Sequence, residues 1–151
     1  MSLPDHSAEV AGLYQEIILD HYRRPRNKGT LPDADTSVEM RNPLCGDEID
    51  LQVSFDGDTI RDVKFSGRGC SISQASASMM TQLIKGKSAD EIDALRARFR
   101  DLVLGDEAAA SDKELGSLRA LAGVSKFPAR VRCALLAWNA LETALEGHHS
   151  T

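Results

Sequence analysis

One alternating stretch followed by a tight turn constrains the fold more than any other feature of the chain. Its apolar positions are Ile49, Leu51, Val53 and Phe55, each separated by one polar residue. Strict alternation over this length is typical of a strand with one buried face. Asp56-Gly57 follows directly, and this dipeptide is a strong signal for a β-hairpin. The sequence therefore predicts an antiparallel hairpin that needs a covering layer on one face.

The segments on either side extend this hairpin into a three-stranded meander. Val38 and Met40 alternate with charged residues and predict a short strand before it. A third strand is expected from about Thr59 to Ser66, with inward apolar residues near its end. Ile60 does not fit the phase of that strand, which suggests a β-bulge.

The remaining apolar-periodic segments predict helices. They span about residues 7–22, 71–85, 88–102 and 115–123, and from Pro128 to about residue 145. Ser88 and Glu91 have the spacing of a capping box at the start of one of them. We expect an α+β fold in which the helices pack on one face of the three-stranded antiparallel sheet. Residues 1–151 are predicted to form a single domain, with flexible ends at 1–7 and 147–151.

Composition and charge narrow the classes of function. The 151 residues contain 42% apolar and 27% charged residues, as in an ordinary globular protein. The net charge of -5 argues against a nucleic-acid-binding protein. No apolar run is long enough for a membrane span, and the N-terminus lacks the features of a signal peptide. The odd number of three cysteines argues against a disulfide framework, so we expect a cytoplasmic protein with reduced thiols.

The three cysteines fall at positions that the predicted fold can bring together. Cys45 lies on a bend before the long strand, and Asp47 follows two residues later. Cys70 ends the Gly-rich segment after the third strand, and Cys133 lies near the start of the last helix. Three thiolates and one carboxylate make four ligands, which is the number that a tetrahedral zinc ion takes.

A metal ion held by these ligands would leave a negative charge that a nearby cation can balance. A zinc dication with three thiolates and a carboxylate carries a formal charge of about -2. Arg130 precedes Cys133 by three residues and so lies on the same face of the predicted helix. We therefore expect Arg130, rather than Arg132, to lie beside the metal ligands.

A structural interpretation of the same residues stays open on sequence grounds. Cysteine is among the most buried residue types, so Cys70 and Cys133 can be small core residues. Cys45, on its polar bend, fits this interpretation less well. Asp47 can be an ordinary turn residue, and Arg130 a solvated helix residue.

Three groups of residues resemble a known family. They are Asp20-His21-Tyr22 with Pro25-Arg26-Asn27, then residues 42–47 (Asn-Pro-Leu-Cys-Gly-Asp), then residues 67–76 around Cys70. Together with Cys133 they are similar to the iron–sulfur cluster assembly family of IscU, the N-terminal domain of NifU, and SufU. The resemblance runs from about residue 13 to residue 145 and implies the α+β fold expected above.

Two features make the chain resemble the SufU type within that family. IscU-type chains carry a histidine directly before the third cysteine, whereas this chain has Arg132 there. The stretch between the second and third cysteines is also longer here, and residues 85–111 look like the insertion typical of SufU. The segment from Phe127 to Trp138 is similar to SufU as well.

The resemblance implies a zinc-dependent sulfurtransferase or sulfur carrier. Zinc (Zn2+) would be bound by Cys45, Asp47, Cys70 and Cys133. The partner would be a SufS-type pyridoxal-phosphate (PLP) cysteine desulfurase, with cluster-assembly proteins downstream. Cys45 would leave the zinc and accept sulfane sulfur as a persulfide, a histidine of the desulfurase could take the vacated position, and Arg130 could stabilise the thiolate or persulfide. These assignments make Cys45 and Arg130 the expected catalytic residues.

Two other functions remain compatible with the sequence. The four ligands could hold a transient [2Fe–2S] cluster, which would make the chain an assembly scaffold. Alternatively, the chain could be a small structural zinc domain whose role is partner binding, in which case removal of zinc would unfold it.

Overall fold

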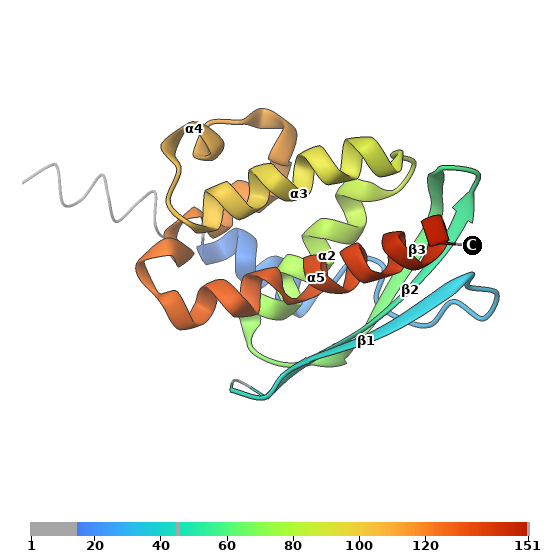
Figure 1. The fold of residues 1–151 in the computed structure, drawn as a ribbon. Helices are drawn as coiled ribbons and strands as arrows, with labels where there is room; N and C mark the ends of the chain where they lie inside the picture. The colour runs from blue at the N-terminus through green and yellow to red at the C-terminus, as the bar shows by residue number, and fades with distance from the viewer. Residues whose placement is uncertain (1–14, 45, 151) are drawn as a thin grey trace, which may run out of the picture.

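The computed structural model describes residues 15–44 and 46–150, and its central element is a three-stranded antiparallel sheet (Figure 1). The strands are β1 (Thr36–Asn42), β2 (Asp47–Asp56) and β3 (Thr59–Arg68), in the order β1-β2-β3. The alternation in β2 places its apolar residues on the inner face, where Ile49, Leu51 and Val53 are completely buried. The predicted meander is confirmed.

The register of the sheet contains the predicted bulge. Ser54 pairs with Asp62, but the next residue of β2, Phe55, pairs with Ile60, so Arg61 is skipped. The shift turns Ile60 into the core, where it is 1% exposed. The phase break in the sequence thus has a structural cause, because the extra residue returns the strand to its buried phase.

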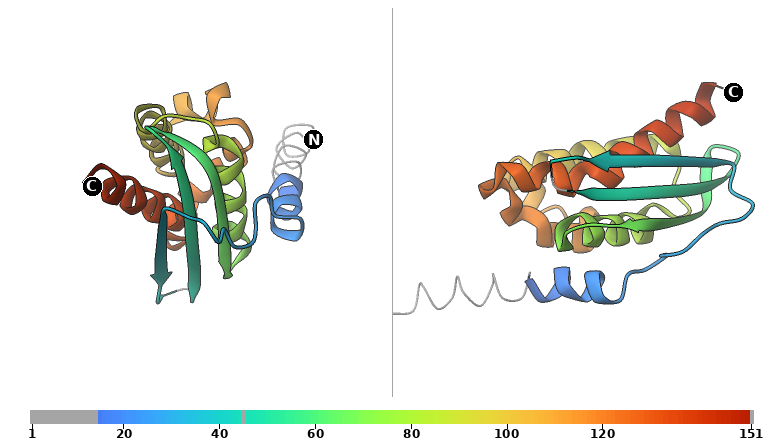
Figure 2. Two further views of the ribbon diagram at one scale, coloured as in Figure 1. Left: turned by 90° about the vertical axis from the view of Figure 1, so that its right-hand side faces the viewer. Right: turned by 90° about the horizontal axis from the view of Figure 1, so that it is seen from below.

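Helices cover the inner face of the sheet. They are a helix over residues 15–23, α2 (Ser71–Ile84), α3 (Ala89–Val103), α4 (Glu107–Ala110), the 3₁₀ segment η1 (Lys113–Lys126) and α5 (Pro128–Ser150). α5 packs on β1 and β2, α2 packs on β3, and these two helices contact each other. Both views of Figure 2 show the helix over residues 15–23 beside α2. The α+β arrangement with helices on one face of the sheet is confirmed.

Two sequence expectations require correction or qualification. The segment expected as a helix over 115–123 is a 3₁₀ segment that continues to Lys126, and Gly116 (φ 55°, ψ −131°) interrupts it. A residue at positive φ interrupts regular helical hydrogen bonding, so two short 3₁₀ pieces meet at a kink at Gly116 instead of one continuous helix. α5 includes residues 147–150, which the sequence analysis assigns to a flexible end; the flexibility of this end stays a prediction. Residues 1–7 and Cys45 lie outside the described residues.

The segment that looks like an insertion, residues 85–111, forms α3 and α4. The predicted capping box is present, because Ser88 Oγ accepts a hydrogen bond from Glu91 N while Ser88 N donates to the Glu91 carboxylate. Phe99 is completely buried and stacks on Trp138 of α5, with ring centroids 5.3 Å apart. The segment therefore contributes to the hydrophobic core instead of forming a surface loop.

Replacement of Phe99 by alanine should test this contribution to the core. Removal of a buried aromatic ring costs about 3–5 kcal/mol of unfolding free energy, because the side chain leaves a cavity. Urea unfolding followed by circular dichroism measures the loss. Arg100→Ala is the matched control, since Arg100 is exposed on the same helix and should change stability by less than about 0.5 kcal/mol. Equal stabilities for the two variants would contradict the assignment.

The motif around His21 connects the N-terminal helix to α2. His21 Nδ1 lies 2.8 Å from Ser78 Oγ, which also accepts a hydrogen bond from the backbone N–H of Arg26 at 2.8 Å. Asn27 Nδ2 donates to Thr81 Oγ1 one turn further along α2. His21 is 4% exposed. This motif thus has a structural role, because it attaches the first helix to the outer side of α2.

Burial should make this attachment sensitive to pH. Desolvation lowers the pKa of His21 below its ordinary value of 6.5, and the nearby Arg26 guanidinium lowers it further, while the Asp20 carboxylate opposes the shift. A histidine with a lowered folded pKa contributes stability that is present above the unfolded pKa and is lost as the pH falls through the folded value. The unfolding free energy of the wild type should therefore fall more steeply from about pH 7 to 5 than that of His21→Gln. Parallel curves in urea titrations would refute this account.

None of the helices within residues 15–44 and 46–150 combines the length and apolar character that a membrane span requires.

Candidate metal centre

Three sequence-distant side chains meet at one end of the sheet. Asp47 is the first residue of β2, Cys70 is the N-cap residue of α2, and Cys133 lies in the second turn of α5. The carboxylate oxygen and the two Sγ atoms lie within 4.8 Å of one another. The sheet register explains why Asp47 and Cys70 meet, because β3 ends beside the start of β2, where Glu48 pairs with Arg68. The packing of α5 on β1 and β2 brings Cys133 to the same place.

The three ligand candidates differ in their exposure and partners. Asp47 and Cys133 are completely buried, whereas Cys70 is partly exposed. The backbone N–H of Cys70 donates to Asp47 Oδ1 at 2.8 Å, and Cys70 Sγ lies 3.7 Å from Asp47 Oδ2. Cys133 Sγ donates to the carbonyl oxygen of Ala129 at 3.7 Å. The hydrogen bond from Cys70 N fixes the Asp47 carboxylate in an orientation that leaves Oδ2 directed toward the thiol.

Gly69 makes the close approach of the two strands' ends possible. A Cβ atom at this position would collide with Asp47 Oδ1 and would lie 2.7 Å from Ser73 Oγ. Gly69 also has a φ of +158°, which side chains rarely adopt. Only glycine therefore lets the backbone before Cys70 pass directly over the Asp47 carboxylate.

The negative charge of the cluster stabilises the protonated guanidinium of Arg130. The charge of the Cys70 thiolate, followed by that of the Cys133 thiolate, raises the pKa of the Arg130 guanidinium above its ordinary value. Arg130 is an exposed residue in the first turn of α5. It thus lies beside both thiols, in the position that the three-residue spacing to Cys133 predicts.

The donor set fits a metal cation. A buried carboxylate beside two thiolates is unfavourable unless a cation or hydrogen-bond donors balance the charge. Zinc lies about 2.3 Å from thiolate sulfur and about 2.0–2.2 Å from carboxylate oxygen, so ligand atoms of one tetrahedral ion are about 3.5–4 Å apart. The observed cluster needs only small side-chain movements to reach that spacing.

The structure places most, but not all, of the predicted site residues. It brings Asp47, Cys70 and Cys133 together, with Arg130 beside them, as the sequence analysis expects. Cys45 lies outside the described residues, so its place in the centre stays a prediction. The roles of the other three residues as metal ligands also stay predictions.

Asn42 and Ser73 belong to the motifs quoted from the sequence, but the sequence alone assigns no role to either residue. Asn42 is 8% exposed and pairs with Asp47 in the sheet register. Ser73 is completely buried, and its hydroxyl donates to the carbonyl oxygen of Cys70 at 3.2 Å. The position of Ser73 three residues after Cys70, within the first turn of a helix, is the signal that could have identified it.

The fold and the cluster together define a class of α+β proteins that collect thiol and carboxylate ligands at one end of a three-stranded sheet. The chain belongs to the family described as the NifU-like N-terminal domain, which matches residues 13–149. This result confirms the family resemblance found in the sequence.

Several relatives are similar over nearly the whole chain. The zinc-dependent sulfurtransferase SufU of Bacillus subtilis is 52% identical and covers 90% of this chain and 91% of its own length. The iron–sulfur cluster assembly scaffold protein IscU of Streptococcus pyogenes is 49% identical over 89% of this chain and 83% of its own. A crystal structure from Fervidobacterium islandicum, described as an assembly scaffold protein for the SUF system, has a TM-score of 0.79 at 39% identity, covering 86% and 94% of the two chains.

Proposed function

We propose that this chain is a zinc-dependent sulfurtransferase that accepts persulfide sulfur from a cysteine desulfurase for iron–sulfur cluster assembly. The main support for the proposal is that the ligand atoms of Asp47, Cys70 and Cys133 lie within 4.8 Å of one another. Arg130 lies beside them. The Bacillus relative, named a zinc-dependent sulfurtransferase, supports it. A site that depends on reduced thiols also agrees with a cytoplasmic location.

The proposed ligands are Cys45, Asp47, Cys70 and Cys133. Zinc, when bound, keeps thiolate ligands deprotonated at neutral pH and has no redox chemistry of its own. Asp47 completes the set as an oxygen ligand, and the hydrogen bond from Cys70 N holds its carboxylate in place. Cys45, which precedes Asp47 by two residues on the β1–β2 bend, is the proposed sulfur acceptor.

The transfer step needs no oxidant. The thiolate of Cys45 attacks the terminal sulfur of the protonated persulfide on a cysteine of the desulfurase. A new S–S bond forms at Cys45, the S–S bond on the desulfurase breaks, and the electron pair leaves on the desulfurase cysteine as a thiolate. The proton remains on the transferred sulfur. Arg130, which lies beside Cys70 and Cys133, is proposed to stabilise the negative charge of the acceptor thiolate and, after the transferred sulfur loses its proton, that of the persulfide.

The proposed partner is a SufS-type, pyridoxal-phosphate-dependent cysteine desulfurase, and the proteins that receive the sulfur would be cluster-assembly proteins. Alanine formation from cysteine by the desulfurase, with and without the zinc-loaded chain, tests this role. A large increase in the rate is expected, because removal of the persulfide frees the enzyme for the next turnover. An unchanged rate would overturn the proposal.

A second function is supported by the streptococcal relative, which is named an assembly scaffold. In that case the same thiols and Asp47 would hold a transient [2Fe–2S] cluster as cargo. Anaerobic incubation of the chain with iron and sulfide distinguishes the two roles. A stable visible chromophore with unchanged desulfurase activity would favour the scaffold, whereas accelerated desulfurase activity without a chromophore would favour the sulfurtransferase.

A further inference from the structure

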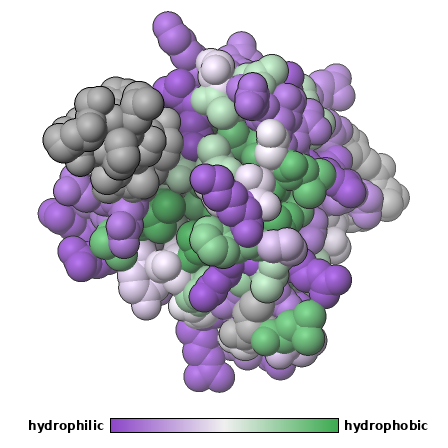
Figure 3. All heavy atoms as spheres, turned by 90° about the vertical axis from the view of Figure 1, so that its left-hand side faces the viewer, coloured by the Kyte–Doolittle hydropathy of each residue, from purple (hydrophilic) through white to green (hydrophobic). Residues whose placement is uncertain are grey.

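Two polar side chains lie directly behind Cys70, in the first turn of α2. Ser73 is completely buried, and Gln74 is 3% exposed. Figure 3 views the molecule from the end that carries the β1–β2 bend, and apolar side chains gather in the middle of this face. Ser73 and Gln74 contribute little to that surface because both are buried. A buried hydroxyl and a buried amide are retained in proteins mostly where they form hydrogen bonds.

The hydrogen bonds of these two residues run toward the carbonyl oxygen of Cys70. Ser73 Oγ donates its single proton to that oxygen at 3.2 Å. The Ser73 oxygen can then only accept, and it accepts a bond from Gln74 Nε2 at 3.4 Å. The backbone N–H of Gln74 also donates to the Cys70 carbonyl, at 3.2 Å. Two donors therefore hold this carbonyl, and the Gln74 amide orients one of them.

These bonds compensate for the loss of ordinary helix capping at Cys70. Cys70 is the N-cap residue of α2, with φ −69° and ψ 167°, but its side chain forms no capping hydrogen bond with the described residues. An N-cap side chain normally accepts a bond from the first turn and so stabilises the conformation of the cap. The Cys70 thiol instead lies 3.7 Å from Asp47 Oδ2. The conformation of Cys70 must therefore be stabilised through its backbone groups.

The backbone of Cys70 is held on both sides of its Cα atom. On the amide side, its N–H donates to Asp47 Oδ1 at 2.8 Å. On the carbonyl side, the Ser73 hydroxyl and the Gln74 N–H hold its oxygen. Rotation about either bond to Cα would break one of these contacts. The direction in which the thiol leaves the backbone is thereby fixed, as is typical of ligands that outer hydrogen bonds orient.

The Gln74 amide is retained at a cost in stability. Its Oε1 atom is buried and has no hydrogen-bond partner among the residues that the structure describes. A buried acceptor without a partner is unfavourable, because it has lost its hydrogen bonds to water. An apolar side chain of the same length would avoid this cost. Such a conflict with stability is expected at functional sites, and it favours a role of Gln74 in the metal centre.

We propose that Ser73 and Gln74 are positioning residues that keep the Cys70 thiol directed at the metal position. The inference rests on the proposed function, because it presupposes a zinc centre at Asp47, Cys70 and Cys133. It adds a difference between the proposed ligands. Cys70 is the anchored thiol, and it keeps its direction while Cys45 accepts sulfur.

Cobalt(II) bound in place of zinc tests this role, because its absorption bands depend on the geometry of its thiolate ligands. Ser73→Ala should weaken zinc binding about tenfold in competition with a chelator, and it should shift the cobalt–thiolate bands. Gln74→Met keeps the length of the side chain and removes the amide. It should shift the same bands in the same direction by a smaller amount, because it acts through the Ser73 hydroxyl.

Two substitutions in the same helix are matched controls. Ser78→Ala removes a buried hydroxyl that contacts His21, so it should lower the urea midpoint and leave zinc affinity and the cobalt bands unchanged. Gln82→Met makes the same chemical change as Gln74→Met at an exposed position, and it should alter none of the three quantities. Circular dichroism verifies that each variant is folded. If Ser73→Ala does not fold, the comparison of Gln74→Met with Gln82→Met decides.

The outcomes separate the positioning role from the proposed function. If Ser73→Ala and Gln74→Met bind zinc and absorb as the wild type does, the positioning role is wrong. It is also wrong if Ser78→Ala shifts the bands as Ser73→Ala does, because the effect then follows from general destabilisation. Either result with a wild type that accelerates the desulfurase leaves the proposed function intact. A wild type that binds neither zinc nor cobalt overturns both.

Discussion

Replacement of Cys45 by alanine should reduce alanine formation to the rate of the desulfurase alone. The reason is chemical, because the variant lacks the thiolate that attacks the persulfide and no other side chain on the β1–β2 bend is a sulfur nucleophile. The measurement is the initial rate of alanine release at saturating cysteine. A variant that accelerates the enzyme as the wild type does would remove Cys45 from the mechanism.

Competition between the two proteins provides the control for this variant. If Cys45→Ala still binds the desulfurase, an excess of this variant should inhibit the stimulation by the wild type. Loss of activity together with loss of competition would instead indicate that the variant no longer binds the desulfurase. The competition experiment therefore reports binding to the desulfurase, and the rate of alanine release reports sulfur transfer.

Replacement of Gly69 by alanine should weaken zinc binding about 10–100-fold, the range found when the residues that orient metal ligands are disturbed. The added Cβ would collide with Asp47 Oδ1, and the φ of +158° is unfavourable for alanine. The Asp47 carboxylate or the segment before Cys70 must then move. Competition with a chromophoric chelator measures the affinity.

The chain offers a matched glycine for comparison. A Cβ atom added at Gly123 would meet nothing within 4 Å, so Gly123→Ala should bind zinc as the wild type does. Because both substitutions add one methyl group, a difference between them reports the backbone conformation and the close contacts at Gly69, of which the contact with Asp47 is the shortest. Equal affinities for the two variants would show that the close approach at Gly69 does not position the carboxylate.

The sheet and the position of the site could be predicted because each depends on local patterns. The alternation of β2, the Asp56-Gly57 turn and the misplaced Ile60 specify a bulged meander, and the structure contains it. Because β2 and β3 are antiparallel neighbours joined by a hairpin, the start of β2 and the end of β3 must lie at the same end of the sheet. That constraint brings Asp47 close to Cys70.

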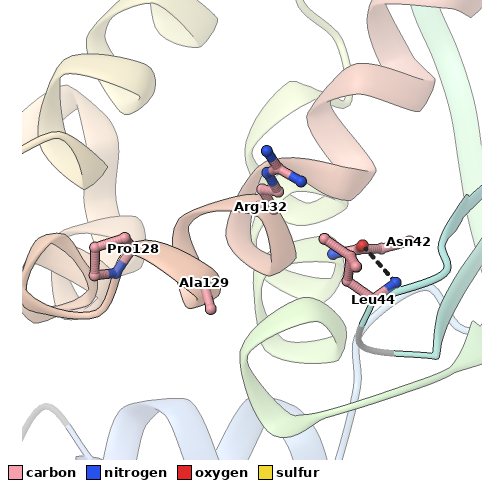
Figure 4. Close-up of a pocket in the computed structure, with 5 residues that line it drawn as sticks. All are labelled: Asn42, Leu44, Pro128, Ala129 and Arg132. Atoms are coloured by element: carbon pink, nitrogen blue, oxygen red, sulfur yellow. Dashed lines mark hydrogen bonds between the residues drawn. The ribbon is translucent and has the colours of Figure 1, made fainter.

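The features that could not be predicted depend on tertiary contacts. Nothing in the apolar pattern of residues 113–126 distinguishes a 3₁₀ segment from an α-helix, and the pattern does not reveal the kink at Gly116. The burial of Ser73 and the contact between Gly69 and Asp47 also require the packed arrangement of α2 on the sheet. The end of β1 and the start of α5 line a common pocket, formed by Asn42, Leu44, Pro128, Ala129 and Arg132 (Figure 4). Periodicity alone does not specify this arrangement.

Intact-mass spectrometry of the zinc-loaded chain after incubation with the desulfurase and cysteine tests the central claim most directly. We expect the mass of the chain to increase by one sulfur atom, located at Cys45 by peptide mapping and absent from Cys45→Ala. A chain that acquires no sulfur while the desulfurase turns over, or that acquires it equally in Cys45→Ala, would contradict the role proposed for this protein.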